Sequence, residues 1–79
     1  MRILDNETGS ALDAVTIYFT RQEAEEAVQS IARLLATPSE HHVHLNDAEY
    51  QREVTISIYS QDNLLEFDER SRRLIQEGI

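Results

Sequence analysis

Two runs of the chain alternate apolar and polar residues, and each is followed by residues typical of a helix start. The first run spans residues 14–19 and the second spans residues 51–59. A period of two indicates a β-strand that buries one of its faces. Two such strands, each leading into a helix, predict a fold of the α+β class.

The first helix is expected to begin after Thr20. Glu23 follows three residues later, and this spacing is that of a capping box, in which each of the two side chains accepts a backbone N–H of the first turn. Apolar residues then recur every three or four positions, namely Ala24, Ala27, Val28, Ile31, Leu34 and Leu35. Thr37-Pro38 should end this helix, because a residue before proline is forced out of helical geometry.

Two further strands complete the expected hairpins. Ile3–Leu4 is followed by turn-forming residues and should pair with the strand at residues 14–19. Residues 41–45 also alternate, and a turn at residues 46–50 separates them from the strand at residues 51–59. The sequence therefore predicts a second hairpin in this region.

A second helix closes the predicted order of elements. Asn63 and Glu66 form another possible capping pair, and helical spacing continues from there to Gly78. The order ββαββα predicts a four-stranded antiparallel sheet with both helices packed on one face. It resembles a permuted ferredoxin-like sandwich, and residues 1–79 are expected to form a single α+β domain.

The predicted sheet has one apolar and one polar face. The apolar face, beneath the helices, should carry Val15, Ile17, Phe19, Val43, Leu45, Val54, Ile56 and Ile58. The polar face should carry Thr16, Tyr18, His42, His44, Thr55, Ser57 and Tyr59. A solvated face is common in antiparallel sheets, but Tyr and His side chains also suit contact with a protein, either a different partner or a second copy in a homodimer.

The charge of the chain limits the partners of this face. Fifteen acidic residues stand against seven basic ones, which gives a formal net charge of −8. Such a charge opposes binding to nucleic acid or to an anionic membrane and favours a basic protein partner. Asp47 and Glu49, in the turn of the second hairpin, are expected to bind this partner together with Tyr18, His42, His44 and Tyr59.

The segment His41-His42-Val43-His44 has the most distinctive chemistry. On a strand, His42 and His44 would share a face about 7 Å apart, so binding of a metal or small ligand there is the alternative function. The chain has no cysteine and no known metal-binding spacing, so we expect no cofactor. It also lacks the nucleophile–base arrangement of a hydrolase and the glycine loop of a phosphate site, so we do not expect an enzyme.

The chain is small and acidic, has no cysteine and carries a His-rich strand at His41–Leu45. In these respects it resembles the immunity proteins that neutralise bacterial toxins. This resemblance implies a tightly bound protein partner and no catalysis. It also implies that the binding residues lie among the acids and on the exposed sheet face.

Met1–Glu7 lacks the apolar run of a signal peptide, and no segment approaches the roughly 20 apolar residues of a membrane span. A cytoplasmic location is therefore expected.

Overall fold

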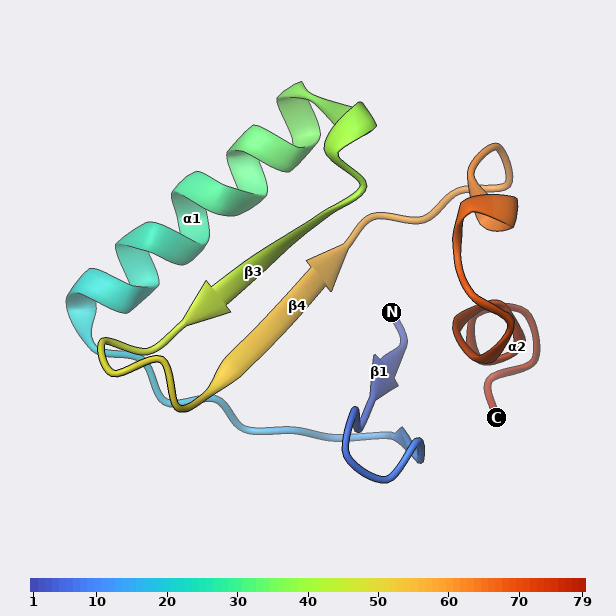
Figure 1. Cartoon of the computed structure of the whole chain (residues 1–79), viewed down its shortest axis with the longest axis horizontal. Helices are drawn as coiled ribbons and strands as arrows, with labels where there is room; N and C mark the ends of the chain where they lie inside the picture. Colours follow the sequence, from blue (N-terminus) through green and yellow to red (C-terminus); the bar gives the residue numbers. More distant parts are fainter. The chain divides into compact units, whose positions relative to one another are not determined.

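The computed structural model describes residues 1–79 and confirms the α+β class (Figure 1). Its elements are β1 (Ile3–Leu4), β2 (Ala11–Leu12), α1 (Arg21–Ala36), η1 (Pro38–Glu40), β3 (His42–Asn46), β4 (Glu53–Ser57), η2 (Leu64–Glu66) and α2 (Glu69–Glu77), where η marks a short 3₁₀ helix. The order ββαββα of the strands and α-helices is confirmed. Neither α-helix has the length and apolar character needed to cross a lipid bilayer.

The chain divides into two compact units. Tyr18–Ile58 forms the hairpin unit, while Met1–Ile17 and Tyr59–Ile79 together form the terminal unit. The single domain expected over the whole chain stays a prediction.

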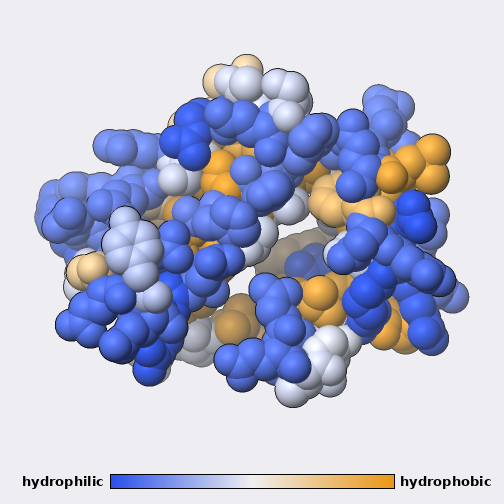
Figure 2. All heavy atoms as spheres, in the orientation of Figure 1, coloured by the Kyte–Doolittle hydropathy of each residue, from blue (hydrophilic) through white to orange (hydrophobic).

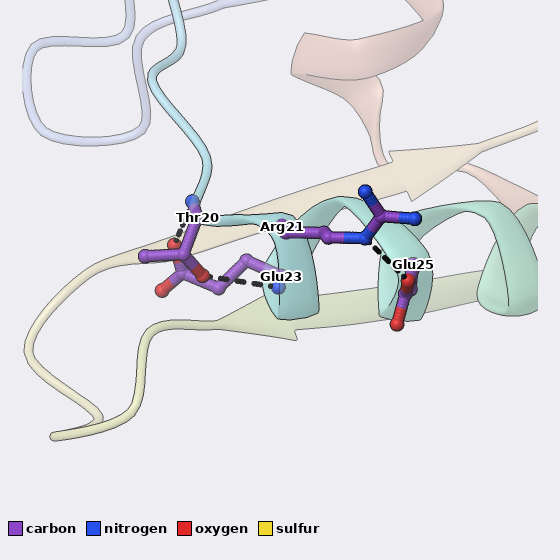
Figure 3. A network of polar contacts seen from close by, with 4 residues as sticks. All are labelled: Thr20, Arg21, Glu23 and Glu25. Carbon is purple, nitrogen blue, oxygen red and sulfur yellow. Dashed lines mark hydrogen bonds and ion pairs between the residues drawn. The ribbon is translucent and has the colours of Figure 1, made fainter.

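Helix α1 of the hairpin unit begins at the predicted capping box (Figure 3). The Glu23 N–H donates to Thr20 Oγ1 at 3.1 Å, and the Thr20 N–H donates to Glu23 Oε1 at 2.8 Å. The helix ends at Ala36, where the Thr37 N–H donates to the carbonyl of Arg33. Both predicted ends of this helix are therefore confirmed.

The core of the hairpin unit lies between α1 and the β3–β4 hairpin. The two strands are antiparallel, with Val43 opposite Ile56, and α1 packs against β3. The buried residues are Ala27, Leu34 and Val43, and Leu34 is only 2% exposed. The helix thus covers one face of the hairpin and leaves the other face open, as the alternating pattern predicts.

The terminal unit joins residues from distant parts of the chain. The Arg70 Nε donates to the carbonyl of Gly9 at 2.9 Å, and the Arg2 Nε donates to the carbonyl of Ile75 at 3.3 Å. Leu74 is its buried residue. These contacts hold α2 against the segment that contains the β1–β2 hairpin.

The predicted four-stranded sheet is wrong, because the structure has two separate two-stranded sheets. Strand β1 pairs with Ala11–Leu12 and not with residues 14–19. Since Ile3 lies opposite Leu12, Met1 would stand opposite Ala14, and nothing in β1 faces residues 15–19. These residues belong to no strand. The side chains expected in the core, Val15, Ile17 and Phe19, are exposed, as is Ile58 just beyond β4.

The predicted start of the second helix is also wrong. The Asn63 side chain accepts the N–H of Ser60 at 2.8 Å, and Asn63 precedes only the short η2 helix, to which it makes no side-chain capping hydrogen bond. The α2 helix starts only at Glu69, because Asp68 Oδ1 accepts the N–H of Ser71 at 2.7 Å. Its predicted end is confirmed, since Gly78 takes the left-handed conformation, with φ at 76°, that often follows a helix.

Candidate interaction site

The open face of the β3–β4 hairpin brings four of the predicted polar residues together. His42 lies opposite Ser57 and His44 lies opposite Thr55, and all four are exposed. Directly opposed residues of an antiparallel pair project from the same side of a sheet. The structure therefore confirms that these residues share one face, on two strands backed by α1.

A polar cluster surrounds His44 on this face. Its Nδ1 lies 2.9 Å from Oε1 of Glu53 and 3.0 Å from Oγ1 of Thr55. The Thr55 hydroxyl also donates to Oε1 of Glu53 at 3.2 Å. The His42 and His44 rings meet edge to face, with centroids 4.8 Å apart.

Sequence reasoning missed Glu53 as a member of this cluster. The signal was available, because Glu53 shares the alternation of Thr55 and Ser57 along β4.

The β3–β4 loop, residues 47–52, is organised by Asp47. Its Oδ1 accepts the N–H of Gln51 at 2.7 Å and that of Arg52 at 3.2 Å. The hydrogen bond from the Arg52 N–H, helped by that from Gln51, lowers the pKa of the Asp47 carboxyl. Asp47 therefore shapes the loop, while Glu49 remains exposed to solvent.

Tyr50 is the second residue that sequence reasoning missed. Its backbone is left-handed, with φ at 56°, and its N–H donates to the carbonyl of Asp47 at 3.0 Å. Its side chain is 80% exposed. A bulky residue rarely adopts this conformation, and such backbone outliers gather at functional sites. The signal in the sequence was an aromatic residue next to Glu49 in a predicted turn.

Tyr18 and Tyr59 are not part of the hairpin face. Tyr18 lies in the extended segment before α1 and is exposed, and Tyr59 follows the end of β4. The structure thus brings His42 and His44 together, places Asp47 and Glu49 in the adjoining loop, and leaves both tyrosines outside the strands.

No group of three or more His, Asp or Glu side chains in the structure is arranged to hold a metal ion. His42 and His44 offer two donor side chains. A surface hollow occurs elsewhere, on α1, but all of its lining residues come from that one helix, so they do not enclose a ligand: Arg21, Ala24, Glu25, Val28 and Gln29.

Hydrophilic residues cover most of the face of the molecule seen in Figure 2, as expected for a net charge of −8. Comparison of the chain with protein-family models, with curated proteins and with solved structures gave no match.

Proposed function

We propose that the protein is a non-enzymatic interaction module that binds a basic protein segment at the hairpin site, defined as the β3–β4 loop and the open face of β3 and β4. The observation that carries this proposal is Tyr50, a large aromatic side chain presented to solvent on a left-handed backbone. A strained backbone persists only where the surrounding structure enforces it. Here the hydrogen bonds of Asp47 do so.

The chemistry of the hairpin site suits an arginine side chain of the partner. A guanidinium group stacks on the face of a tyrosine ring and forms charge-assisted hydrogen bonds with carboxylates. Tyr50 offers the ring, and Glu49 and Glu53 offer exposed carboxylates. His44 contacts Glu53, and the His42 ring meets the His44 ring edge to face, so the two rings add flat, polar contact area to the open face.

The charge of the hairpin unit favours the same class of partner. Tyr18–Ile58 contains seven carboxylates and three arginines. An acidic surface accelerates the approach of a basic protein and repels nucleic acid. This supports the immunity-type role, in which an acidic protein covers the basic surface of a toxin that would otherwise bind a phosphate backbone.

The test is a titration of ¹⁵N-labelled protein with a synthetic peptide of alternating arginine and glycine. We expect amide shift changes confined to residues 42–57, weakened by salt and reduced severalfold by Tyr50→Ala or Glu49→Gln. Leu65→Ala and Glu26→Gln are the matched controls, since both residues are exposed and lie outside the hairpin site, and they should change nothing. Shifts spread over the terminal unit, or full binding by Tyr50→Ala, would refute the proposal.

A homodimer through the open face is the other partner that the polar pattern predicts. It would hide His42, His44, Thr55 and Ser57 from the peptide. Doubling of the mass in solution that is lost in His42→Ala/His44→Ala would identify it.

Binding of a metal or a small ligand at His42 and His44 is the alternative function. The observation in its favour is the 4.8 Å separation of the two rings. The Glu53 carboxylate already contacts Nδ1 of His44, so a metal would compete with this contact for that nitrogen.

A further inference from the structure

Residues 14–19 form an extended segment that has no partner strand. They lead into α1 without belonging to a helix or strand (Figure 1), and their backbone makes no hydrogen bond within the chain. Their side chains are exposed, and Ile17, in the middle of the segment, is 46% exposed. The alternating pattern of a strand is therefore present without the pairing that a strand needs.

Strand β4 also lacks a partner strand along one of its edges. It pairs with β3 on one side only, so alternate residues direct their N–H and C=O groups away from β3. An open edge of this kind accepts a further extended segment. A two-stranded hairpin also gains stability from a third strand. The five residues of β4 are close in number to the six of residues 14–19.

Charge determines what can approach this edge. A second copy of a chain with net charge −8 is repelled over most of its surface. Residues 14–20 and residues 54–61, however, contain no charged side chain. Their contact brings no like charges together, and a register that places Ile17 opposite either Val54 or Ile56 would extend the apolar face that α1 covers.

We propose that two copies of this chain associate by strand addition, with residues 14–19 of each copy pairing with the open edge of β4 in the other. Each copy donates one strand and accepts one, so the two contacts are related by a two-fold axis and the assembly closes at a dimer. The contact uses the edge of the hairpin and not its open face. It is therefore independent of the proposed hairpin site.

The first experiment measures mass by light scattering during size exclusion, from about 1 to 100 μM, a range that brackets the micromolar dissociation constants of modest interfaces. We expect the mass to rise from 9.1 kDa to twice that value. Ile17→Lys should keep the chain monomeric by placing a charge in the contact, and Thr16→Pro should do so by removing an N–H. Val28→Lys is the matched control, because Val28 is 68% exposed on α1, and it should dimerise normally. Circular dichroism verifies that each variant is folded.

The second experiment locates the contact. The chain has no cysteine, so a nitroxide attached at Ser57→Cys labels a single position on β4. Spin-labelled protein at natural isotope abundance is mixed with ¹⁵N-labelled wild type, and we expect the amide signals of residues 14–19 of the wild type to broaden. In the reverse arm, ¹⁵N-labelled protein carrying the nitroxide is diluted with excess unlabelled wild type, and these signals should then sharpen.

Three results would overturn the proposal. One is a mass of 9.1 kDa over the whole range. Another is a dimer in which residues 14–19 keep sharp signals in the mixed sample, which places the contact elsewhere. The third is broadening of residues 14–19 that is absent from the mixed sample and persists on dilution in the reverse arm. That result would mean that β4 pairs with residues 14–19 of its own chain.

Discussion

The Nδ1 atom of His44 lies 2.9 Å from Oε1 of Glu53, an acid nine positions later in the sequence that reaches it from the neighbouring strand. This contact joins an imidazole to a carboxylate on the open face of the hairpin. Any ligand that binds Nδ1 of His44 would have to displace this carboxylate.

We expect Zn²⁺ to leave the Tm of the protein unchanged. Two imidazoles without a third side chain form an incomplete site, since closed zinc sites have four ligands and no group of three is arranged for a metal. If the protein had a zinc site, a Zn²⁺ concentration of a hundred times its Kd would raise the free energy of unfolding by about 2.7 kcal/mol. A melting curve would detect this change easily. A rise in Tm that disappears in His42→Ala/His44→Ala would instead establish the ligand-binding alternative.

Leu34→Ala should destabilise the protein by about 2–5 kcal/mol, as expected for a fully buried leucine. Leu34 is 2% exposed, whereas its neighbour Leu35 is 65% exposed on the same helix. Leu35→Ala should therefore change the free energy of unfolding by less than about 0.5 kcal/mol. Urea denaturation followed by circular dichroism compares the two variants, and equal losses would mean that α1 packs through a different face.

Tyr50→Gly should stabilise the protein by about 1 kcal/mol, because glycine adopts a left-handed backbone without the steric penalty of a side chain. Tyr50→Ala removes the same ring but keeps the unfavourable backbone, so it should bring no such gain. Both variants should lose affinity for the arginine peptide. Thermal melts and the ¹⁵N titration measure the two effects separately, and a gain in stability without a loss of binding would remove Tyr50 from the hairpin site.

Stability should fall as the pH drops below about 4, the ordinary range of an aspartate pKa. The pKa values of three aspartates are lowered by hydrogen bonds: Asp5 by the N–H groups of Glu7 and then Thr8, Asp47 chiefly by that of Arg52, and Asp68 by the hydroxyl and N–H of Ser71. A carboxyl with a lower pKa in the folded state stabilises the fold fully above its unfolded value. This contribution disappears as the pH falls through the folded pKa, because the unfolded chain binds more protons.

Urea denaturation at pH 2.5 to 6 tests this dependence. Asp47→Asn should flatten the curve below pH 4, because it removes one of the three carboxyls whose pKa the fold lowers. Stability that rises on acidification would contradict these assignments.

The features predicted correctly depend on residues close together in sequence. The capping box joins Thr20 to Glu23 within one turn, and the shared face of His42 and His44 follows from strand alternation alone. The predictions that were wrong concern competition between equally plausible local choices. Asn63 and Asp68 can both cap an α-helix, but only the Asp68 side chain does so, whereas the Asn63 side chain accepts the N–H of Ser60.

Residues 14–19 do not form the predicted strand, and Tyr50 was not predicted as a site residue. Both differences have physical causes that the apolar–polar pattern of the sequence does not show. The alternation of residues 14–19 is that of a strand, but pairing depends on the register that the preceding loop sets, and Ile3 lies opposite Leu12. The left-handed backbone of Tyr50 arises from the hydrogen bonds of Asp47 across its loop. Its exposure follows from that geometry, which sequence spacing does not specify.

The hairpin unit is one continuous stretch of chain, whereas the terminal unit is built from two stretches on either side of it. The hydrogen bonds from Arg70 to Gly9 and from Arg2 to Ile75 close loops of 61 and 73 residues, while β3 and β4 meet across a short turn. Long loops lose more entropy on closure and form late. Pulse-labelling hydrogen exchange should therefore detect protection of the β3 and β4 amides before that of the α2 amides.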